Sequence, residues 1–147
     1  MQLESMYQQI ILDHYKHPQG KGLRDPFDAE VHHVNTSCGD EITLRVHRSG
    51  DGFEVSYDGQ GCSISQASAS LMHDIVNGRP DAEAFAAEAA FHSMMQSQGA
   101  GTPDADLLED AVALHGVSKY PARVKCALLA WMAFKDAAST VIAKEQA

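Results

Sequence analysis

The sequence predicts an α+β fold, in which a small three-stranded antiparallel sheet packs against an N-terminal helix and a C-terminal helical layer. Residues 3–16 carry apolar side chains at spacings of three and four, the period of an amphipathic helix. Residues 42–47 and 53–57 alternate apolar and polar side chains, and their Gly- and Asp-rich connection is typical of an antiparallel hairpin. Residues 29–34 have a mixed pattern that predicts the third strand. From 121 to 142 apolar residues recur with the helical period, so we expect a long helix there.

The middle of the chain is predicted to be helical. Ser63 and Gln66 match a capping box, in which Ser is the N-cap and Gln stands three positions later, so a helix is expected to begin there. Residues 77–80 end it, because they include a Gly suited to the left-handed conformation and a Pro that cannot continue a helix. Two more helices are expected at 81–97 and 104–114, the second short and acidic.

Length and charge restrict the possible functions. A chain of 147 residues with 44% hydrophobic residues is expected to form a single domain over residues 1–147. The net charge is −9, so we expect no bulk affinity for nucleic acid or anionic lipid. The N-terminal residues lack a signal-peptide pattern, and no run approaches the ~18 apolar residues of a membrane span. A cytoplasmic protein with no membrane association is therefore expected.

The chain contains three cysteines, which is an odd number for a closed set of disulfides. A reducing compartment also disfavours disulfides, so metal binding or thiol reactivity becomes the leading interpretation. The alternative is that the cysteines are small buried apolar side chains, a common role for free cysteine.

Cys38, Cys62 and Cys126 all lie in glycine-rich segments or at the boundaries of predicted elements, where side chains converge more readily than from element interiors. Asp40 follows Cys38 by two positions, with Gly39 between them, and both side chains can face the same side of a turn. Zinc takes four tetrahedral ligands, usually thiolate, imidazole or carboxylate, and these three thiols and one carboxylate supply four. The cysteine spacing contains no CxxC pair, so spacing alone does not identify a metal site. We favour a shared site over separate buried thiols because of where the three cysteines lie in the chain.

Several motifs in order along the chain carry a family resemblance. They are Met6-Tyr7-Gln8-Gln9-Ile10-Ile11-Leu12-Asp13-His14-Tyr15-Lys16-His17-Pro18, Cys38-Gly39-Asp40, Gly61-Cys62-Ser63-Ile64-Ser65-Gln66-Ala67-Ser68-Ala69-Ser70 and Pro121-Ala122-Arg123-Val124-Lys125-Cys126-Ala127. Together they resemble the SufU branch of the IscU/NifU-like superfamily of iron–sulfur cluster assembly proteins, over nearly the whole chain. The resemblance implies an IscU/SufU-like fold.

Two features favour the SufU branch over IscU-type scaffolds. Lys125 stands where those scaffolds carry a His before the last Cys, and the connection from Cys62 to Cys126 contains an additional helical segment around residues 81–114. The SufU branch resembles a zinc-bound sulfur acceptor more than a scaffold. The alternative is a scaffold that holds a transient [2Fe–2S] cluster, because cysteine thiolates bind iron as well as zinc.

The resemblance implies that Cys38, Asp40, Cys62 and Cys126 bind Zn²⁺. It also implies a persulfide sulfurtransferase that receives sulfur from a SufS-type cysteine desulfurase and passes it to a downstream iron–sulfur assembly scaffold. A closed zinc site is unreactive, so one ligand has to be released. We hypothesise that this ligand is Cys38, and that a desulfurase side chain such as His takes its place.

Two assignments have alternatives of their own. Arg123 matches a family position and is predicted to contact the partner, although an exposed Arg in the first turn of a helix is usually only solvated. The four ligands also suit a structural zinc domain that docks a partner without accepting sulfur.

Overall fold

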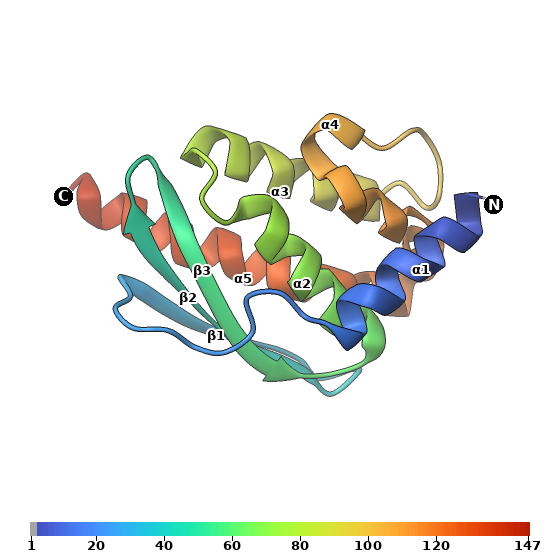
Figure 1. The fold of residues 1–147 in the computed structure, drawn as a ribbon, viewed down its shortest axis with the longest axis horizontal. Coiled ribbons are helices and arrows are strands. Elements are labelled where there is room, and N and C mark those ends of the chain that lie inside the picture. The colour runs from blue at the N-terminus through green and yellow to red at the C-terminus, as the bar shows by residue number, and fades with distance from the viewer. Residues whose placement is uncertain (1–2) are drawn as a thin grey trace.

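The structure is a computed structural model, and it describes residues 3–147. The elements in order are α1 (Leu3–Lys16), β1 (Ala29–Asn35), β2 (Asp40–Ser49), β3 (Gly52–Gln60), α2 (Ser63–Val76), α3 (Asp81–Met95), α4 (Ala105–Leu108), the 3₁₀ helix η1 (Glu109–Lys119) and α5 (Pro121–Glu145). One helix precedes three strands, and the other helices follow and gather on one side of the sheet (Figure 1). The predicted α+β fold, with its three-stranded antiparallel sheet, is confirmed.

The sheet has the order β1-β2-β3, and both strand pairs are antiparallel. Burial alternates along β2, with Leu44 and Val46 fully buried on the face toward the helices. Tyr57 and Val55 lie opposite them on β3 and are buried on the same face. The strands are longer than predicted, because pairing extends β2 back to Asp40. That extension places a predicted site residue at the end of the sheet.

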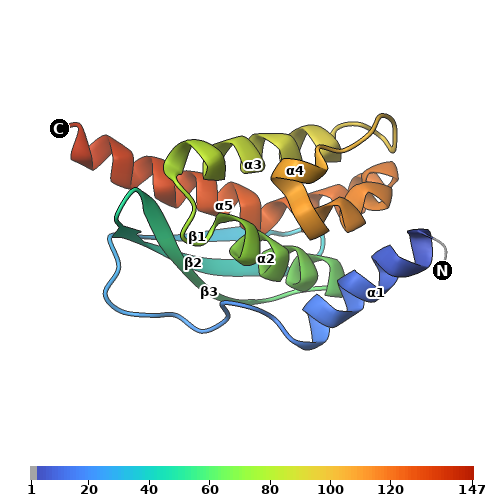
Figure 2. The same cartoon turned by 45° about the horizontal axis from the view of Figure 1, so that its top comes forward.

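The helix α5 is the centre of the hydrophobic core. Figure 2 shows it running the length of the molecule, with α3 on one side and the sheet on the other. Trp131 is fully buried and stacks on Phe91 of α3, with ring centroids 4.2 Å apart. Its indole N–H donates to Ser68 Oγ of α2 at 3.0 Å, and that hydroxyl donates to the carbonyl of Ala127 at 2.6 Å. The core therefore fixes α2 and α5 relative to each other.

By length and composition α5 meets the criterion for a membrane-spanning helix, contrary to the expectation that no segment approaches one. Half of its most apolar window is buried inside the fold, and its interior residues pack on the sheet and on α2. The apolar character of α5 is that of a core helix. The cytoplasmic location stays a prediction.

The N-terminal segment is held on the surface of this core. The helix α1 has no fully buried residue among those described, and its main contacts are with α2 and η1. His14 Nδ1 lies 2.7 Å from Ser70 Oγ, and the same hydroxyl accepts the backbone N–H of Gln19 at 2.8 Å. This buried serine therefore anchors both the end of α1 and the start of the following loop.

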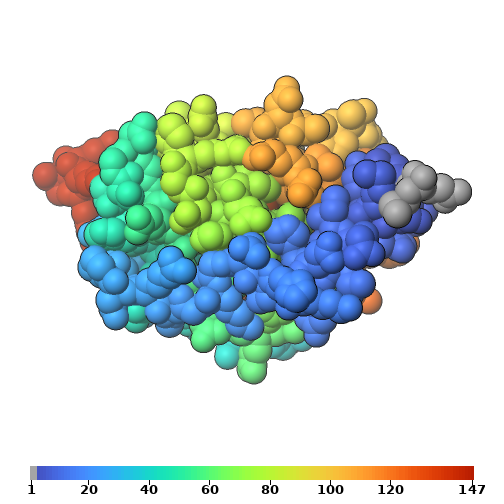
Figure 3. Space-filling view, in the orientation of Figure 1, coloured from blue at the N-terminus to red at the C-terminus, as the bar shows by residue number. Residues whose placement is uncertain are grey.

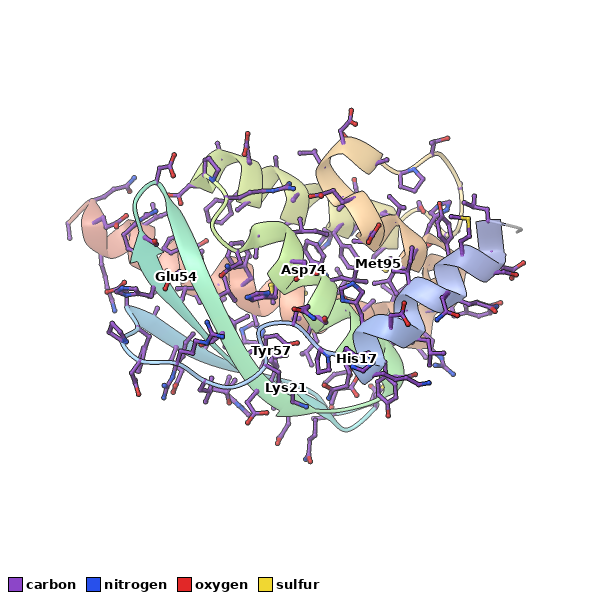
Figure 4. All side chains as sticks on the ribbon, in the orientation of Figure 1. His17, Lys21, Glu54, Tyr57, Asp74 and Met95 are labelled. Carbon is purple, nitrogen blue, oxygen red and sulfur yellow. The ribbon has the colours of Figure 1, made fainter. Side chains whose placement is uncertain are left out.

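The loop after α1 covers the outer edge of β3. Figure 3 shows this N-terminal part of the chain as a continuous blue band across the face in view. The loop forms a bridge at Lys21 with Tyr57, and the two residues lie next to each other in Figure 4. Gly22 N–H donates to the Tyr57 carbonyl at 2.6 Å, so an edge that would otherwise be open is partly paired.

Three boundaries differ from the prediction. Helix α2 begins at Ser63 with Cys62 at the N-cap, and no side chain makes the predicted capping bond. Helix α3 ends at Met95. The predicted helix at 104–114 is a four-residue α-helix followed by a 3₁₀ helix to Lys119, because Glu109 has a φ of +47° at its start and interrupts the α-helical hydrogen bonds.

Candidate metal centre

Three parts of the chain meet at the end of the sheet that lies nearest α1 in Figure 1: the β1–β2 turn, the start of α2 and the first turns of α5. Each carries predicted site residues. Cys38 is in the turn, Asp40 is the first residue of β2, Cys62 is the N-cap of α2, and Cys126 is in the second turn of α5. Elements far apart in the sequence thus bring the candidate ligands to one end of the fold.

The turn between β1 and β2 positions the first two residues. Asn35 pairs with Asp40 as the last register position of the hairpin. The Cys38 N–H donates to the Asn35 carbonyl at 3.3 Å, and Gly39 takes a φ of +70°, a conformation that favours glycine. This tight turn directs the side chains of Cys38 and Asp40 toward α5.

The structure brings together Cys38, Asp40 and Cys126. One ligand atom from each lies within 4.8 Å of the other two, and the two sulfur atoms are 3.1 Å apart. Cys38 is exposed, whereas Asp40 is 0% and Cys126 is 2% exposed. Within residues 3–147 no other group of three His, Cys, Asp or Glu side chains meets this criterion. The cluster is consistent with a metal site.

Asp40 gives a separate reason to place a cation here. Its Oδ1 accepts the backbone N–H of Cys62 at 2.9 Å. Its Oδ2 is buried and has no hydrogen-bond partner among the residues that the structure describes. A buried polar atom without a partner costs about 1–3 kcal/mol, more if charged, so a carboxylate oxygen oriented this way suits coordination to a metal ion.

Gly61 leaves room for this carboxylate. A Cβ atom at position 61 would lie 2.3 Å from Asp40 Oδ1 and 2.4 Å from Ser65 Oγ, far inside van der Waals contact. The φ of Gly61 is not in the left-handed region, so the need for glycine is steric. The start of α2 therefore closes over Asp40 only because residue 61 lacks a side chain.

Cys62 is adjacent to the cluster but outside it. Its sulfur does not belong to the group whose ligand atoms lie within 4.8 Å of one another, and its side chain is half-buried. Three of the four predicted ligands converge, and the fourth supports the site through its backbone N–H to Asp40. Its coordination by sulfur stays a prediction.

Cys126 holds its proton firmly when no cation is bound. Burial raises the pKa of the Cys126 thiol, and the nearby side chains of Cys38, Asp40 and Cys62 raise it further. The carbonyl of Ala122 accepts from both Cys126 Sγ and Cys38 Sγ, at 3.6 and 3.8 Å. A metal ion has to displace this proton to bind the thiolate. Two thiolates with a carboxylate suit zinc or iron better than magnesium or calcium.

Arg123 lies on the first turn of α5 and is exposed. It lines a groove of about 460 Å³ between α1, η1 and the start of α5, together with Tyr7, Ile11, Ile64 and Tyr120. Ile64 is two residues after Cys62 and Arg123 is three before Cys126, so the groove is lined by sequence neighbours of two predicted ligands. Contact of Arg123 with a partner stays a prediction.

Sequence reasoning missed two residues that build the site. Asn35 donates its side-chain N–H to Cys126 Sγ at 3.9 Å. Its position directly after the predicted strand 29–34, three residues before Cys38, was the only available indication. Gly61 was recognised as part of the chain leading to Cys62, but its contact with Asp40 depends on how α2 docks against β2.

The comparisons with known proteins agree with this architecture. The family model described as the NifU-like N terminal domain matches residues 6–127, a range that includes all four predicted ligands. The chain belongs to this family, and the resemblance found in its motifs is confirmed. It is thus a member of the IscU/NifU-like superfamily.

Within the family the chain is similar to proteins of two kinds. It is 42% identical to the zinc-dependent sulfurtransferase SufU of Bacillus subtilis (strain 168), covering 98% of this chain and 94% of the relative. It is 40% identical to the iron–sulfur cluster assembly scaffold protein IscU of Streptococcus pyogenes serotype M1, covering 92% and 84%. A crystal structure from Fervidobacterium islandicum AW-1, titled as a candidate iron–sulfur cluster assembly scaffold protein for the SUF system, matches with a TM-score of 0.80, 31% identity and coverage of 92% and 98%. Similarity alone therefore does not choose between sulfur transfer and scaffolding.

Proposed function

We propose that this protein takes part in iron–sulfur cluster assembly as a zinc-dependent sulfurtransferase. In this role it accepts persulfide sulfur from a SufS-type cysteine desulfurase. The observation that carries the proposal is an exposed thiol, Cys38, in contact with a cluster whose other two members, Asp40 and Cys126, are buried. The thiol of Cys38 is accessible to another protein, whereas Asp40 and Cys126 are shielded from solvent. The sulfurtransferase relative, which aligns over almost the whole chain, supports the same choice.

Cys38, Asp40, Cys62 and Cys126 are the residues that would hold zinc. When bound, zinc would keep its thiol ligands deprotonated, so that a ligand released from it is a thiolate ready to attack. The unpartnered Asp40 Oδ2 and the close pair of sulfur atoms fit this group. The Cys62 side chain would have to move toward the other three to join them, while its backbone N–H already contacts Asp40.

Sulfur transfer by this chain is a thiol exchange at Cys38. The Cys38 thiolate attacks the outer sulfur of the persulfide on the desulfurase cysteine. A bond forms between Cys38 Sγ and that sulfur, while the sulfur–sulfur bond of the donor breaks and its electron pair leaves on the donor cysteine as a thiolate. Cys38 then carries the persulfide, and a downstream iron–sulfur assembly scaffold receives the sulfur. The exposure of Cys38 gives the donor access, which the buried Cys126 lacks.

Two further assignments belong to this proposal. Arg123 contacts the desulfurase, supported by its exposed position on a groove lined by sequence neighbours of Cys62 and Cys126. Residues 1–147 act as one SufU/IscU-like domain, supported by a continuous hydrophobic cluster that joins the sheet to α2, α3 and α5.

Mass spectrometry after incubation with a SufS-type desulfurase and cysteine tests the proposal. We expect one added sulfur on Cys38 and none when Cys38→Ala is used, while Cys38→Ala still unfolds cooperatively. Sulfur on Cys62 or Cys126 instead would contradict the acceptor assignment. Loss of folding in Cys38→Ala would indicate a structural zinc domain.

The second candidate is a scaffold for a transient [2Fe–2S] cluster, favoured by the similarity to the Streptococcus pyogenes scaffold. It predicts a coloured protein that contains iron and labile sulfide. A colourless protein with one zinc ion per chain favours the transfer function. Metal analysis of the purified protein separates the two.

A further inference from the structure

The two thiols at the cluster are in contact with each other, yet their surroundings differ. Their sulfur atoms are 3.1 Å apart, and the Ala122 carbonyl accepts a hydrogen bond from each thiol. The side-chain amide of Asn35 donates an N–H to Cys126 Sγ at 3.9 Å. Among the residues that the structure describes, no N–H group is recorded as a donor to Cys38 Sγ. One amide therefore distinguishes the two sulfur atoms.

An N–H donor changes the behaviour of a thiolate. A hydrogen bond to an ionised group is stronger than one between neutral groups, and it stabilises the negative charge on the sulfur. Charge held in this way is less available for attack on another sulfur atom. Cys126 is 2% exposed, so water does not compete for the position that the amide occupies. The effect acts on one sulfur and leaves its neighbour unchanged.

Asn35 also holds the backbone of the other thiol. Its carbonyl accepts the N–H of Cys38 at 3.3 Å, and its own position is fixed by pairing with Asp40 at the end of the hairpin. The same residue thus links the turn that carries Cys38 to the helix that carries Cys126. Amides that contact metal-ligating residues in this way set the orientation and strength of the ligands.

We propose that Asn35 is a positioning residue that keeps Cys126 as the retained ligand and thereby directs sulfur to Cys38. The inference rests on the proposed sulfur-transfer function. It states that Cys38 is the sulfur acceptor both because its side chain is exposed and because the Asn35 amide binds the other thiol. Without the amide, the Cys126 thiolate becomes more nucleophilic and loses the contact that orients it as a ligand.

Alkylation of the zinc-loaded protein by iodoacetamide, read at each cysteine by mass spectrometry, tests this directly. In Asn35→Leu, which has a similar volume and no donor, we expect the ratio of the Cys126 rate to the Cys38 rate to rise about tenfold. We also expect zinc release to a coloured chelator to accelerate by a similar factor. Thr36→Ala is the matched control, because it changes an exposed neighbour in the same turn and is expected to leave the ratio unchanged.

A purely structural role for Asn35 predicts a different result. Loosening of the turn would raise alkylation of Cys38 and Cys126 together, so their ratio would stay within about twofold and the proposal would be overturned. If Asn35→Leu unfolds, Asn35→Asp repeats the measurement with an acceptor in place of the donor at nearly the same size. A raised ratio in Asn35→Asp supports the proposal, and an unchanged ratio rejects it. Neither measurement requires a desulfurase, so a failure of the sulfur-transfer function would be seen separately.

Discussion

Replacing Gly61 by alanine tests whether the space above Asp40 is needed for metal binding. The new Cβ would lie 2.3 Å from Asp40 Oδ1, whereas ordinary van der Waals contact begins at 3.4 Å. The carboxylate therefore has to withdraw by about 1 Å, which breaks its 2.9 Å hydrogen bond with the Cys62 N–H. Because Asp40 is fully buried, this displacement has no compensating contact with water.

The size of the effect follows from what is lost. A buried hydrogen-bonding group left without its partner costs about 1–3 kcal/mol of folding free energy. Disturbing the groups that orient a metal ligand reduces metal affinity by about 10–100-fold. We therefore expect Gly61→Ala to unfold at a lower denaturant concentration in the metal-free state and to lose zinc to a competing chelator at a lower chelator concentration.

Gly116→Ala is the matched control. A Cβ there meets nothing within 4 Å, and Gly116 has no positive φ among the recorded glycines. Both substitutions reduce the entropy of the unfolded chain equally, so the difference between them reports the contact with Asp40. Equal zinc affinity and equal stability of the two variants would refute the steric reasoning.

Two further substitutions test the core and the half-buried His73 of α2. Ser68→Ala leaves the buried indole N–H of Trp131 without its acceptor and should lower the free energy of unfolding by about 1–3 kcal/mol, measured by the fluorescence of this single tryptophan during urea unfolding. Ser139→Ala changes an exposed serine and should alter stability little. An equal effect of the two substitutions would contradict the prediction. Burial lowers the pKa of His73 below its ordinary value of 6.5, and the neighbouring Asp74 opposes this in part. Just below pH 6.5 the unfolded chain therefore binds a proton that the folded chain does not. The contribution of neutral His73 to folding stability is complete above pH 6.5 and is lost as the pH falls toward the pKa of the folded state. His73→Gln should therefore reduce the slope of unfolding free energy against pH below pH 6.5. The same slope in both proteins would rule this out.

Much of the fold follows from local patterns in the sequence. The alternation in residues 42–47 and 53–57 predicted two strands joined by a hairpin, because side chains on a half-buried strand alternate between the core and the outer face. The apolar stripe from 121 to 142 predicted α5 for the same kind of reason. Boundaries were less accurate. The break at Glu109 depends on how α4 and η1 pack over α3, which periodicity does not describe.

The candidate site was predictable in its members and less so in its arrangement. The chemistry of three thiols and a carboxylate, and their places in turns or at helix starts, identified Cys38, Asp40, Cys62 and Cys126 as a set. Their convergence depends on contacts across more than 80 positions, such as the one between Cys38 and Cys126. The order and spacing of residue types along the chain do not give the distance in space between such residues.

By itself the sequence determined which residues are available for the site and which elements carry them, because residue type and periodicity act locally. Only the tertiary structure decided that Asp40 is fully buried with one oxygen unpartnered, that Cys38 is exposed beside the buried Cys126, and that Cys62 stands just outside the group. It also assigned Asn35 and Gly61 to the site. These properties arise where the end of the sheet, α2 and α5 pack together, and packing between distant segments is the step that local sequence does not specify.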